Sequence, residues 1–403
     1  MEGKFEVVPS GGVTSPRGFY AGTACAGIKE STGGNPDIGI LFSETVCTAA
    51  ALFTTNRIKA PPLILSRERI QDGRAAAVVV NSGCANAFTG EQGMADVEEM
   101  AGLAAESIGA SSEDVLVAST GVIGRQLPME RVRAGMSKIV LSRDGGHKMA
   151  RVIMTTDTVP KEMAVSIGGG QFVIGGIAKG SGMIHPDLAT MLCFLTTDAS
   201  VEVSFLKYAL RSAADISFNM LSIDGDTSTN DMMLVMANGL AGNETITEGS
   251  LQSDIFQQAL NYVCVHLAKE LARDGEGASK LIEVTVSGAR SMSGARVAAR
   301  TIVSSPLVKA AIYGNDPNWG RIVAAAGRSG LEIVEAKIDL YIGDICLVQA
   351  GHPQPMDNSA ITRVLKESEV SIALNLNLGS AEATAWGCDL TEEYVTINSQ
   401  YTT

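Results

Sequence analysis

The residues best suited to chemistry lie together near the middle of the chain, in the run KGSGMIHPDLATML over residues 179–192. A glycine-rich approach, a proline, and a threonine after a small residue are typical of a nucleophile released by self-cleavage. If the bond between Ala189 and Thr190 breaks, Thr190 becomes an N-terminus that carries both a hydroxyl group and a free α-amine. The reference pKa of an α-amine is about 7.7–8.0, so its neutral fraction can accept the hydroxyl proton near neutral pH. The run therefore predicts a threonine nucleophile with its own base; the alternative interpretation is a buried loop before the apolar run Met191–Leu195.

Two further loops carry groups that could assist such a nucleophile. Thr120 and Gly121 follow a predicted strand, and their hydroxyl group and backbone N–H could stabilise one oxyanion. The alternative there is a glycine-rich turn with no chemical role. Glu276 stands between two glycines after a predicted helix. Its carboxylate could bind an amine, or it could be a solvated acid where the helix ends.

Metal and nucleotide sites are not predicted. Residues 224–231, DGDTSTND, are rich in oxygen ligands but lack the glycine and glutamate spacing of an EF-hand, so we expect a hydrogen-bonded turn network. The four histidines are far apart and the seven cysteines form no Cys-x-x-Cys pair, which predicts reduced, mostly buried thiols and no metal. No Gly-x-x-x-x-Gly-Lys-Ser/Thr motif occurs, and we expect no bound cofactor.

The composition is that of a well-buried protein with an acidic surface. Hydrophobic residues make up 45% of the 403 residues, and a chain of this length predicts two or three domains. The formal net charge of −13 argues against nucleic acids and anionic membranes as partners, although a local basic patch could hold an anionic ligand. No apolar run approaches the roughly 18 residues of a membrane-spanning helix, and the first residues lack the pattern of a secretory signal, so we expect a cytoplasmic protein.

The hydrophobic pattern predicts alternating strands and helices, an α/β organisation. Strands are expected at Ala76–Val80, Val115–Ala118, Phe172–Gly175, Leu281–Val286 and Ile333–Ile342, and helices around Val97–Ile108, Phe205–Phe218 and Leu251–Leu271. Residues 241–252 are polar and predict a surface connection. Trp319 and Trp386 lie among turn-forming residues, where indole packing predicts a structural role.

Ten short motifs, in a fixed order along the chain, together resemble one known family. They are PRGF at 16–19, FTTN at 53–56, NSG at 81–83, STGVIG at 119–124, TTDT at 155–158, the runs 179–192, 224–231 and 274–280, DPNWGR at 316–321, and 385–390. The family is that of the ornithine acetyltransferases, the ArgJ proteins of arginine biosynthesis. The resemblance covers essentially the whole chain, and collinear motifs of this length are highly specific.

The resemblance implies a layered α/β fold of the ArgJ/DmpA-like type, with an active site organised like that of the N-terminal-nucleophile hydrolases. It implies self-cleavage between Ala189 and Thr190 into an α chain, residues 1–189, and a β chain, residues 190–403. The two chains would stay associated as a heterotetramer of two α and two β chains. In the implied ping-pong reaction, Thr190 takes the acetyl group from N2-acetyl-L-ornithine, releases ornithine and passes the group to L-glutamate. Some members also accept acetyl-CoA, a possible substrate that the sequence leaves open here.

The family's functional positions can be carried over one by one. Thr120 and Gly121 match its oxyanion stabilisers. The substrate-binding positions match Thr156, Lys179, Thr190 and Glu276, together with Asn398 and Thr403 of the C-terminal Asn-x4-Thr that closes over the substrate. Lys179 suits an α-carboxylate, whereas Glu276 suits the free amino end of the substrate.

Two other functions compete with this interpretation. An amidase or aminopeptidase with the same nucleophile would transfer the acyl group to water instead of glutamate. A non-catalytic binding protein would remain one uncleaved chain and bind amino acids without turnover. Two properties distinguish the transferase, the hydrolase and the binding protein. They are the molecule that accepts the acyl group and whether the Ala189–Thr190 bond is cleaved.

Overall fold

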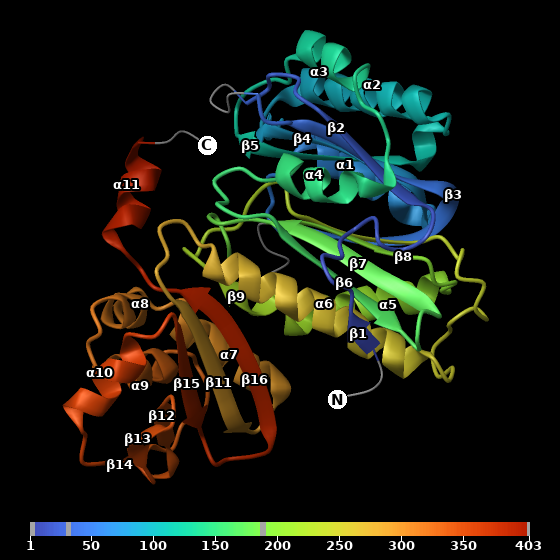
Figure 1. The fold of residues 1–403 in the computed structure, drawn as a ribbon. Helices are drawn as coiled ribbons and strands as arrows, with labels where there is room; N and C mark the ends of the chain where they lie inside the picture. Colours follow the sequence, from blue (N-terminus) through green and yellow to red (C-terminus); the bar gives the residue numbers. More distant parts are fainter. Residues whose placement is uncertain (1–4, 30–33, 186–190, 401–403) are drawn as a thin grey trace.

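The computed structural model describes residues 5–29, 34–185 and 191–400, which form a layered α/β structure (Figure 1). Within this part of the chain there are two mixed sheets, with helices between them and on their outer faces. The predicted layered α/β fold is confirmed. In the described residues no helix is long and apolar enough to cross a membrane.

The larger sheet has nine strands among the described residues. In spatial order they are β1 (Phe5–Val7), β6 (Lys161–Ile167), β7 (Phe172–Lys179), β8 (Leu192–Thr197), β10 (Met232–Ala237), β3 (Ile38–Phe53), β4 (Arg74–Cys84) and β5 (Val115–Val122), with β2 (Phe19–Ala24) paired to the first part of β3. Every residue of β8 and β10 is buried, because apolar layers cover both faces of these central strands. Two strands that follow residue 190 thus lie between two strands that precede it.

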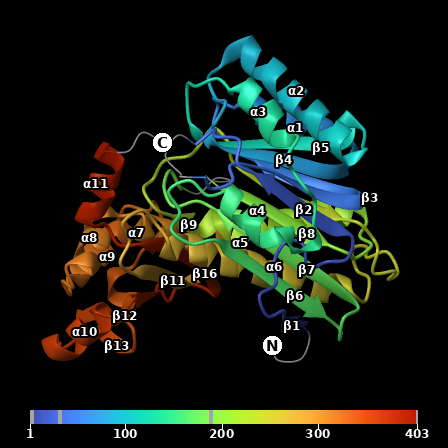
Figure 2. The same ribbon diagram turned by 45° about the horizontal axis from the view of Figure 1, so that its top comes forward.

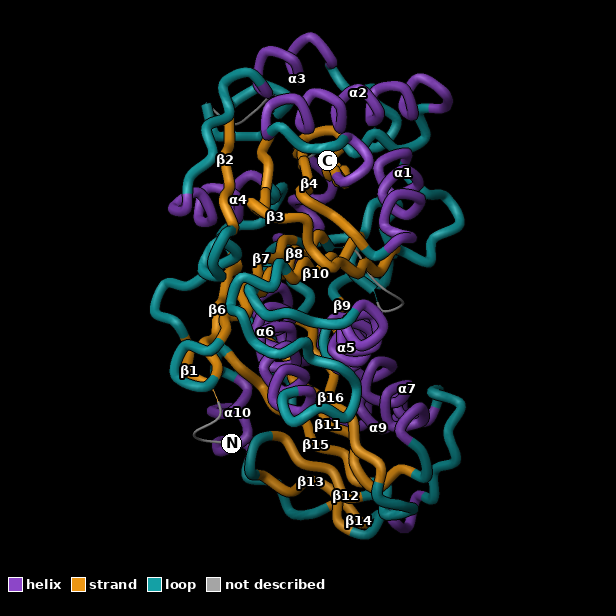
Figure 3. Tube along the Cα trace, turned by 90° about the vertical axis from the view of Figure 1, so that its right-hand side faces the viewer, coloured by secondary structure: helices purple, strands orange, loops and turns teal. Residues whose placement is uncertain are grey.

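Helices cover this sheet unevenly. They are α1 (Pro61–Arg69), α2 (Gly90–Ile108), α3 (Met129–Met136), α4 (Gly146–Val152), α5 (Val203–Ile216) and α6 (Ser253–Arg273). The face of α2 that carries Val97 and Met100 packs with α3 against β4 and β5. In α5, Phe205 and Leu206 are buried, whereas Lys207 and Arg211 are exposed on the opposite face. Figures 2 and 3 show α5 and α6 between the two sheets.

The smaller sheet has seven strands among the described residues and lies entirely after Met220. In spatial order they are β14 (His352–Pro353), β13 (Ile345–Gln349), β12 (Asp339–Ile342), β15 (Glu369–Asn375), β11 (Leu281–Ala289), β16 (Ala381–Cys388) and β9 (Leu221–Ser222). The accompanying helices are α7 (Met292–Val303), α8 (Pro306–Tyr313), α9 (Trp319–Gly327), α10 (Asn358–Leu365) and α11 (Glu392–Gln400). In Figure 1, α11 rises from this sheet along the side of the molecule towards the upper layer.

Most of the elements expected from the pattern are present, with two corrections. The expected strand Ile333–Ile342 exists only as β12, because Glu335–Lys337 form an exposed 3₁₀ turn before it. The expected helix to Phe218 ends at Ile216, and a 3₁₀ turn follows. One continuous hydrophobic cluster joins the two sheets and includes Val165 of β6, Leu267 of α6 and Ile372 of β15, while two further clusters belong to the larger sheet alone. The expectation of two or three domains stays a prediction.

Candidate active site

A cleft at the ends of the central strands brings together six of the residues that the sequence singles out. Thr120, Gly121, Thr156, Lys179, Glu276 and Asn398 all line it. They come from β5, from the loop before β6, from the end of β7, from the loop after α6, and from α11. Ala189, Thr190 and Thr403 lie outside the described residues. The described chain approaches Thr190 at His185 on one side and at Met191 on the other.

One wall of the cleft is built from backbone and neutral side chains. Thr120 is buried within β5, and Gly121 follows it with a φ of +125°, a conformation that favours glycine. A Cβ atom at Gly121 would lie 2.5 Å from the carbonyl carbon of Gly83. Glycine is thus required both by the backbone conformation and by the close approach of the neighbouring strand. The arrangement can present a hydroxyl group and a peptide N–H to one developing oxyanion.

Buried amide side chains hold this neutral wall in place. The Nδ2 of Asn230 donates to the carbonyl oxygens of Ala85 at 2.7 Å and Ser119 at 3.0 Å. The Ser119 hydroxyl donates to Oδ1 of Asn81 at 2.6 Å, and the Nδ2 of Asn81 donates to the Cys84 carbonyl at 2.8 Å. These bonds satisfy backbone groups where the strands end and fix the wall before any substrate binds. The supporting role of Asn230 was not predicted, because its partners are over 100 residues away in the sequence.

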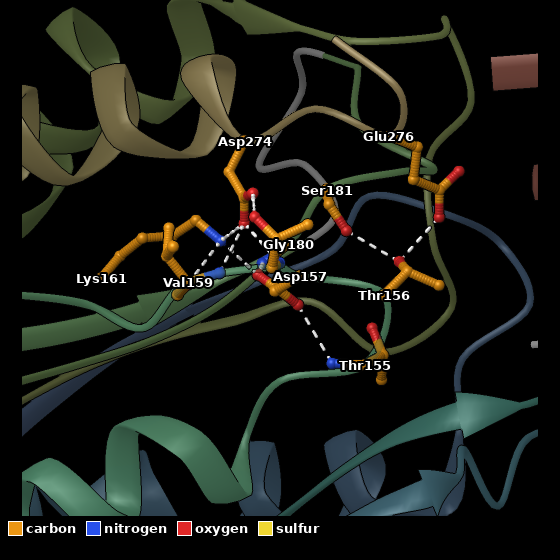
Figure 4. A network of polar contacts seen from close by, with 10 residues as sticks. Thr155, Thr156, Asp157, Val159, Lys161, Gly180, Ser181, Asp274 and Glu276 are labelled. Carbon is orange, nitrogen blue, oxygen red and sulfur yellow. Dashed lines mark hydrogen bonds and ion pairs between the residues drawn. The ribbon is translucent and has the colours of Figure 1, made fainter. Parts of the chain in front are cut away.

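The opposite wall is charged and is centred on Glu276. The Thr156 hydroxyl donates to Oε1 of Glu276 at 2.7 Å, and the Nδ2 of Asn398 donates to Oε2 at 2.8 Å (Figure 4 shows the Thr156 bond). The Ser181 hydroxyl lies 2.7 Å from that of Thr156, and the Ser181 carbonyl accepts from the Glu276 N–H at 2.7 Å. Glu276 is thus held on both carboxylate oxygens at the edge of burial. A carboxylate fixed in this way can bind an ammonium group.

Behind this wall, a buried ion network fixes the start of the glycine-rich run. The Lys161 ammonium lies 2.6 Å from Asp157 and 2.5 Å from Asp274 (Figure 4). Asp157 also accepts from the backbone N–H groups of Thr155 at 3.0 Å and Gly180 at 2.7 Å. Burial raises the pKa of the Asp157 carboxyl group, but the charges of Lys161 and Lys179 outweigh it, and the net shift is downward. The network therefore holds an ionised carboxylate against the chain that leads to residue 190.

Lys179 lines the cleft and interacts electrostatically with Asp231, a second buried titratable group behind it. Burial lowers the pKa of the Lys179 ammonium, against the opposing influence of Asp157 and Asp231. Burial also raises the pKa of the Asp231 carboxyl group well above its usual range, and Lys179 only partly offsets this. The sequence reasoning missed a further lysine: burial lowers the pKa of Lys29 to about 8, and its chain packs against Gly83 of the neutral wall.

The acidic loop at residues 224–231 forms a network of turns, as expected. Asp224 accepts from the backbone N–H groups of Met183, at 2.5 Å, and Ile184, at 2.9 Å. In the described ranges no group of three or more His, Cys, Asp or Glu side chains is placed to hold a metal ion. The carboxylate thus ties the second half of the glycine-rich run to this loop.

The tryptophan segments lie in the packing of the smaller sheet. Trp386 is buried in β16, and its indole N–H donates to Glu283 at 2.8 Å. Trp319 begins α9 and packs against the shared core. Neither lines the cleft, in keeping with the predicted structural role of both residues.

Comparisons with known proteins give a consistent result. The sequence profile of the ArgJ family matches residues 20–403. The chain is 55% identical to the arginine biosynthesis bifunctional protein ArgJ of Symbiobacterium thermophilum, over 98% of this chain and 99% of that protein. It is 51% identical to the protein of the same name from Dehalococcoides mccartyi, over 100% of both.

Two solved structures are similar to parts of the chain. The crystal structure of the arginine biosynthesis bifunctional protein from Bacillus halodurans is 47% identical with a TM-score of 0.51, and the match covers 52% of this chain and 98% of that chain. An ornithine acetyltransferase from Mycobacterium tuberculosis, complexed with ornithine, is 36% identical with a TM-score of 0.42, covering 45% of this chain and 98% of that chain.

Proposed function

The chain belongs to the ArgJ family, and from this premise we propose that Thr190 carries an acetyl group from N2-acetyl-L-ornithine to L-glutamate. The chain is an acetyltransferase of arginine biosynthesis. In the first half-reaction the Thr190 hydroxyl attacks the acetyl carbonyl carbon, and its proton passes through the α-amine to the departing N2 of ornithine. In the second, the amino group of glutamate attacks the acetyl ester, which releases N-acetyl-L-glutamate and restores Thr190.

One observation carries this assignment of roles: the neutral wall and the charged wall face the same cleft. We assign the Thr120 hydroxyl and the Gly121 N–H to the oxyanion that forms during both half-reactions. Lys179 binds the α-carboxylate common to ornithine and glutamate derivatives. Glu276, held by Thr156 and Asn398, binds the distal ammonium group of ornithine.

Self-cleavage between Ala189 and Thr190 supplies the free α-amine that this chemistry needs. The same oxyanion stabilisers serve the attack of the Thr190 hydroxyl on the Ala189 carbonyl. The relative from Bacillus halodurans supports a divided chain, since its crystallised chain is matched over 98% of its length yet covers only 52% of this one. We propose that the halves stay together, as two α and two β chains, and that Thr403 completes the cleft beside Asn398.

The name bifunctional, shared by the relatives from Symbiobacterium and Dehalococcoides, supports a second acetyl donor. We propose that acetyl-CoA is that donor and that it gives the same acetyl-Thr190 enzyme. Glutamate would then be acetylated without recycling ornithine. No bound cofactor enters either reaction.

The first test is the intact mass of the denatured protein, combined with transfer assays. We expect two species, each about half of 42.0 kDa, with Thr190 at the start of the second. Thr190→Ala should remain one full-length chain and transfer no acetyl group. Appreciable transfer by that variant would overturn the mechanism. If N2-acetylornithine releases free acetate even when glutamate is present, the protein is a hydrolase. If the wild-type chain stays uncleaved and shows no turnover, it is a binding protein.

A further inference from the structure

A second cavity, separate from the cleft, lies on the C-terminal half of β3. It is a groove of about 630 Å³ bounded by Ala50–Phe53 of β3, by the end of α1 and by the exposed face of α5. Figure 3 shows α1 and α5 on the same side of the molecule, with strands of the larger sheet between them. Its volume is in the range of small-molecule and cofactor sites.

The groove is strongly basic in a protein whose formal net charge is −13. Lys59, Arg67, Lys207 and Arg211 line it, and no acidic side chain does so among the described residues. The ion pairs found in the described part of the chain include none of these four cations. Uncompensated cations around one cavity are suited to a ligand with several negative charges, such as phosphate groups.

The floor of the groove offers a second kind of contact. β3 pairs with β10 over Thr48–Phe53, but its pairing with β4 ends at Thr48. Along Ala50–Phe53 the other edge of β3 therefore carries backbone groups that no described strand pairs. Such an edge forms hydrogen bonds with amides that lie along it. The floor therefore offers hydrogen-bonding groups to the polar part of a ligand that lies in the groove.

The groove leads towards the cleft. Thr54 lies at its end, and the Thr54 hydroxyl donates at 2.8 Å to the carbonyl of Ser228, which lines the cleft. The sheet register gives the distance: Lys179 pairs with Leu192, Leu192 with Met232, and Met232 with Phe53. Three strand spacings of about 4.8 Å place Phe53 roughly 14 Å from Lys179 along the sheet.

We propose that this groove binds the phosphate groups of an acyl-coenzyme A, the second acetyl donor, whose phosphopantetheine arm reaches from the groove to the cleft. The inference rests on the proposed acetyl transfer through Thr190. The arm of coenzyme A has about as many backbone bonds as four extended residues, roughly 15 Å, which matches the path from cleft to groove. The arm therefore spans this path, and the phosphates at its far end reach the groove, where they contact Arg67, Lys207 and Arg211. N2-acetylornithine does not require a neighbouring groove with these features, since the proposed function places it in the cleft.

The reaction in this arrangement reaches the same intermediate as the first donor. The Thr190 hydroxyl attacks the thioester carbonyl carbon, a C–O bond forms, and the C–S bond breaks. The thiol of coenzyme A leaves with the proton given up by the hydroxyl group. Glutamate then accepts the acetyl group as before, so the two donors share the cleft but only the thioester uses the groove.

The test is a double charge reversal in the groove, Lys207→Glu with Arg211→Glu. Both side chains are exposed, so folding should be little affected. We expect the kcat/KM for acetyl-CoA to fall at least tenfold relative to that for N2-acetylornithine, with glutamate as acceptor in both assays. The matched control is Arg363→Glu with Lys366→Glu, exposed positions in the last turn of α10 and directly after it, which should leave the ratio unchanged.

Calorimetric binding of coenzyme A to the full protein gives a readout independent of turnover. Wild type should bind coenzyme A more tightly than its form without the 3′-phosphate, and the groove variant should bind both weakly. Equal binding to wild type and to the groove variant, no binding to wild type, or equally tight binding of tripolyphosphate would each overturn the inference. Failure of acetyl exchange between N2-acetylornithine and glutamate would instead overturn the proposed function, and the assays separate the two outcomes.

Discussion

The two walls of the cleft are built in opposite ways. On one side, Thr120 and Gly121 present neutral donors fixed by strand pairing and by buried amide side chains. On the other, Lys179 and Glu276 present an amine and a carboxyl group, and Glu276 is held by side chains from a loop and from α11. The first wall is set by backbone geometry and the second by side-chain pairing.

This difference separates two tasks. A neutral, rigid wall mainly stabilises negative charge that appears only in the transition state, because its hydrogen-bond donors are already in place and need no reorganisation. A charged wall binds groups that carry charge throughout the reaction, and so it contributes to ground-state affinity as well. Changes in the first wall should therefore act on kcat, and changes in the second on KM.

The largest effect is expected from Gly121→Ala. The added Cβ would lie 2.5 Å from the Gly83 carbonyl carbon in a backbone with φ of +125°, so the N–H must move away from the oxyanion. We expect self-cleavage and transfer to fall more than about 10³-fold, measured by intact mass and steady-state kinetics. Gly124→Ala is the matched control, since its φ is +81° but nothing lies within 4 Å of the added carbon. Equal losses in both variants would contradict the oxyanion role.

Thr120→Ala removes the side-chain donor of the same wall without a collision. We expect kcat to fall by about 10²-fold or more, with little change in KM, and self-cleavage to slow in parallel. Thr120→Ser keeps the hydroxyl group and should recover most of the rate. Turnover of the alanine variant at the wild-type rate would remove Thr120 from the oxyanion site.

Glu276→Gln tests the charged wall. The amide keeps the shape of the side chain but loses the charge that attracts the distal ammonium of ornithine. We expect the KM for N2-acetylornithine to rise roughly 10- to 100-fold with a much smaller change in kcat. Glu392→Gln on the exposed start of α11 is the control. A variant in which kcat falls and KM is unchanged would contradict the assignment of substrate binding to the charged wall.

The smallest expected effect is a pH dependence of donor affinity through Lys179. Because burial lowers the pKa of its ammonium, Lys179 loses its charge at a lower pH than an exposed lysine does. The protonated form binds a carboxylate, so KM for N2-acetylornithine should rise a few-fold as pH increases through the lowered pKa. Steady-state assays with the α-carboxamide analogue of the donor should show no such rise. A parallel rise for the analogue would place the titration elsewhere.

The sequence predicted the neutral wall better than the charged one. Thr120 and Gly121 were identified from a local pattern, a strand ending at Ala118 followed by a turn, although the structure extends β5 to Val122 and places both residues inside it. The pairing of Glu276 with Asn398 joins residues 122 positions apart, and no local pattern contains it. The resemblance to a family supplied the residues but not the bonds between them.

The basic groove was still further from prediction. Its cations lie between residues 59 and 211, at spacings that carry no pattern, and only the strand order of the larger sheet brings them together. The composition allowed a local basic patch without locating it. Residues that become neighbours through sheet topology are those that local sequence reasoning could not identify.

The position of β8 and β10 in the larger sheet affects whether the protein can refold after it has been denatured. In the precursor, the pairing of Lys179 with Leu192 closes a short intrachain connection, which costs little entropy. If the Ala189–Thr190 bond is cut as we propose, the same pairing joins two separate chains, and refolding requires β8 and β10 of one chain to pair again between β7 and β3 of the other. Denaturation of the cleaved protein should therefore be irreversible. Its stability is then kinetic and is set by the rate of unfolding. The uncleaved chain is therefore the form that folds, and the cleaved form retains a fold that it cannot readily regain.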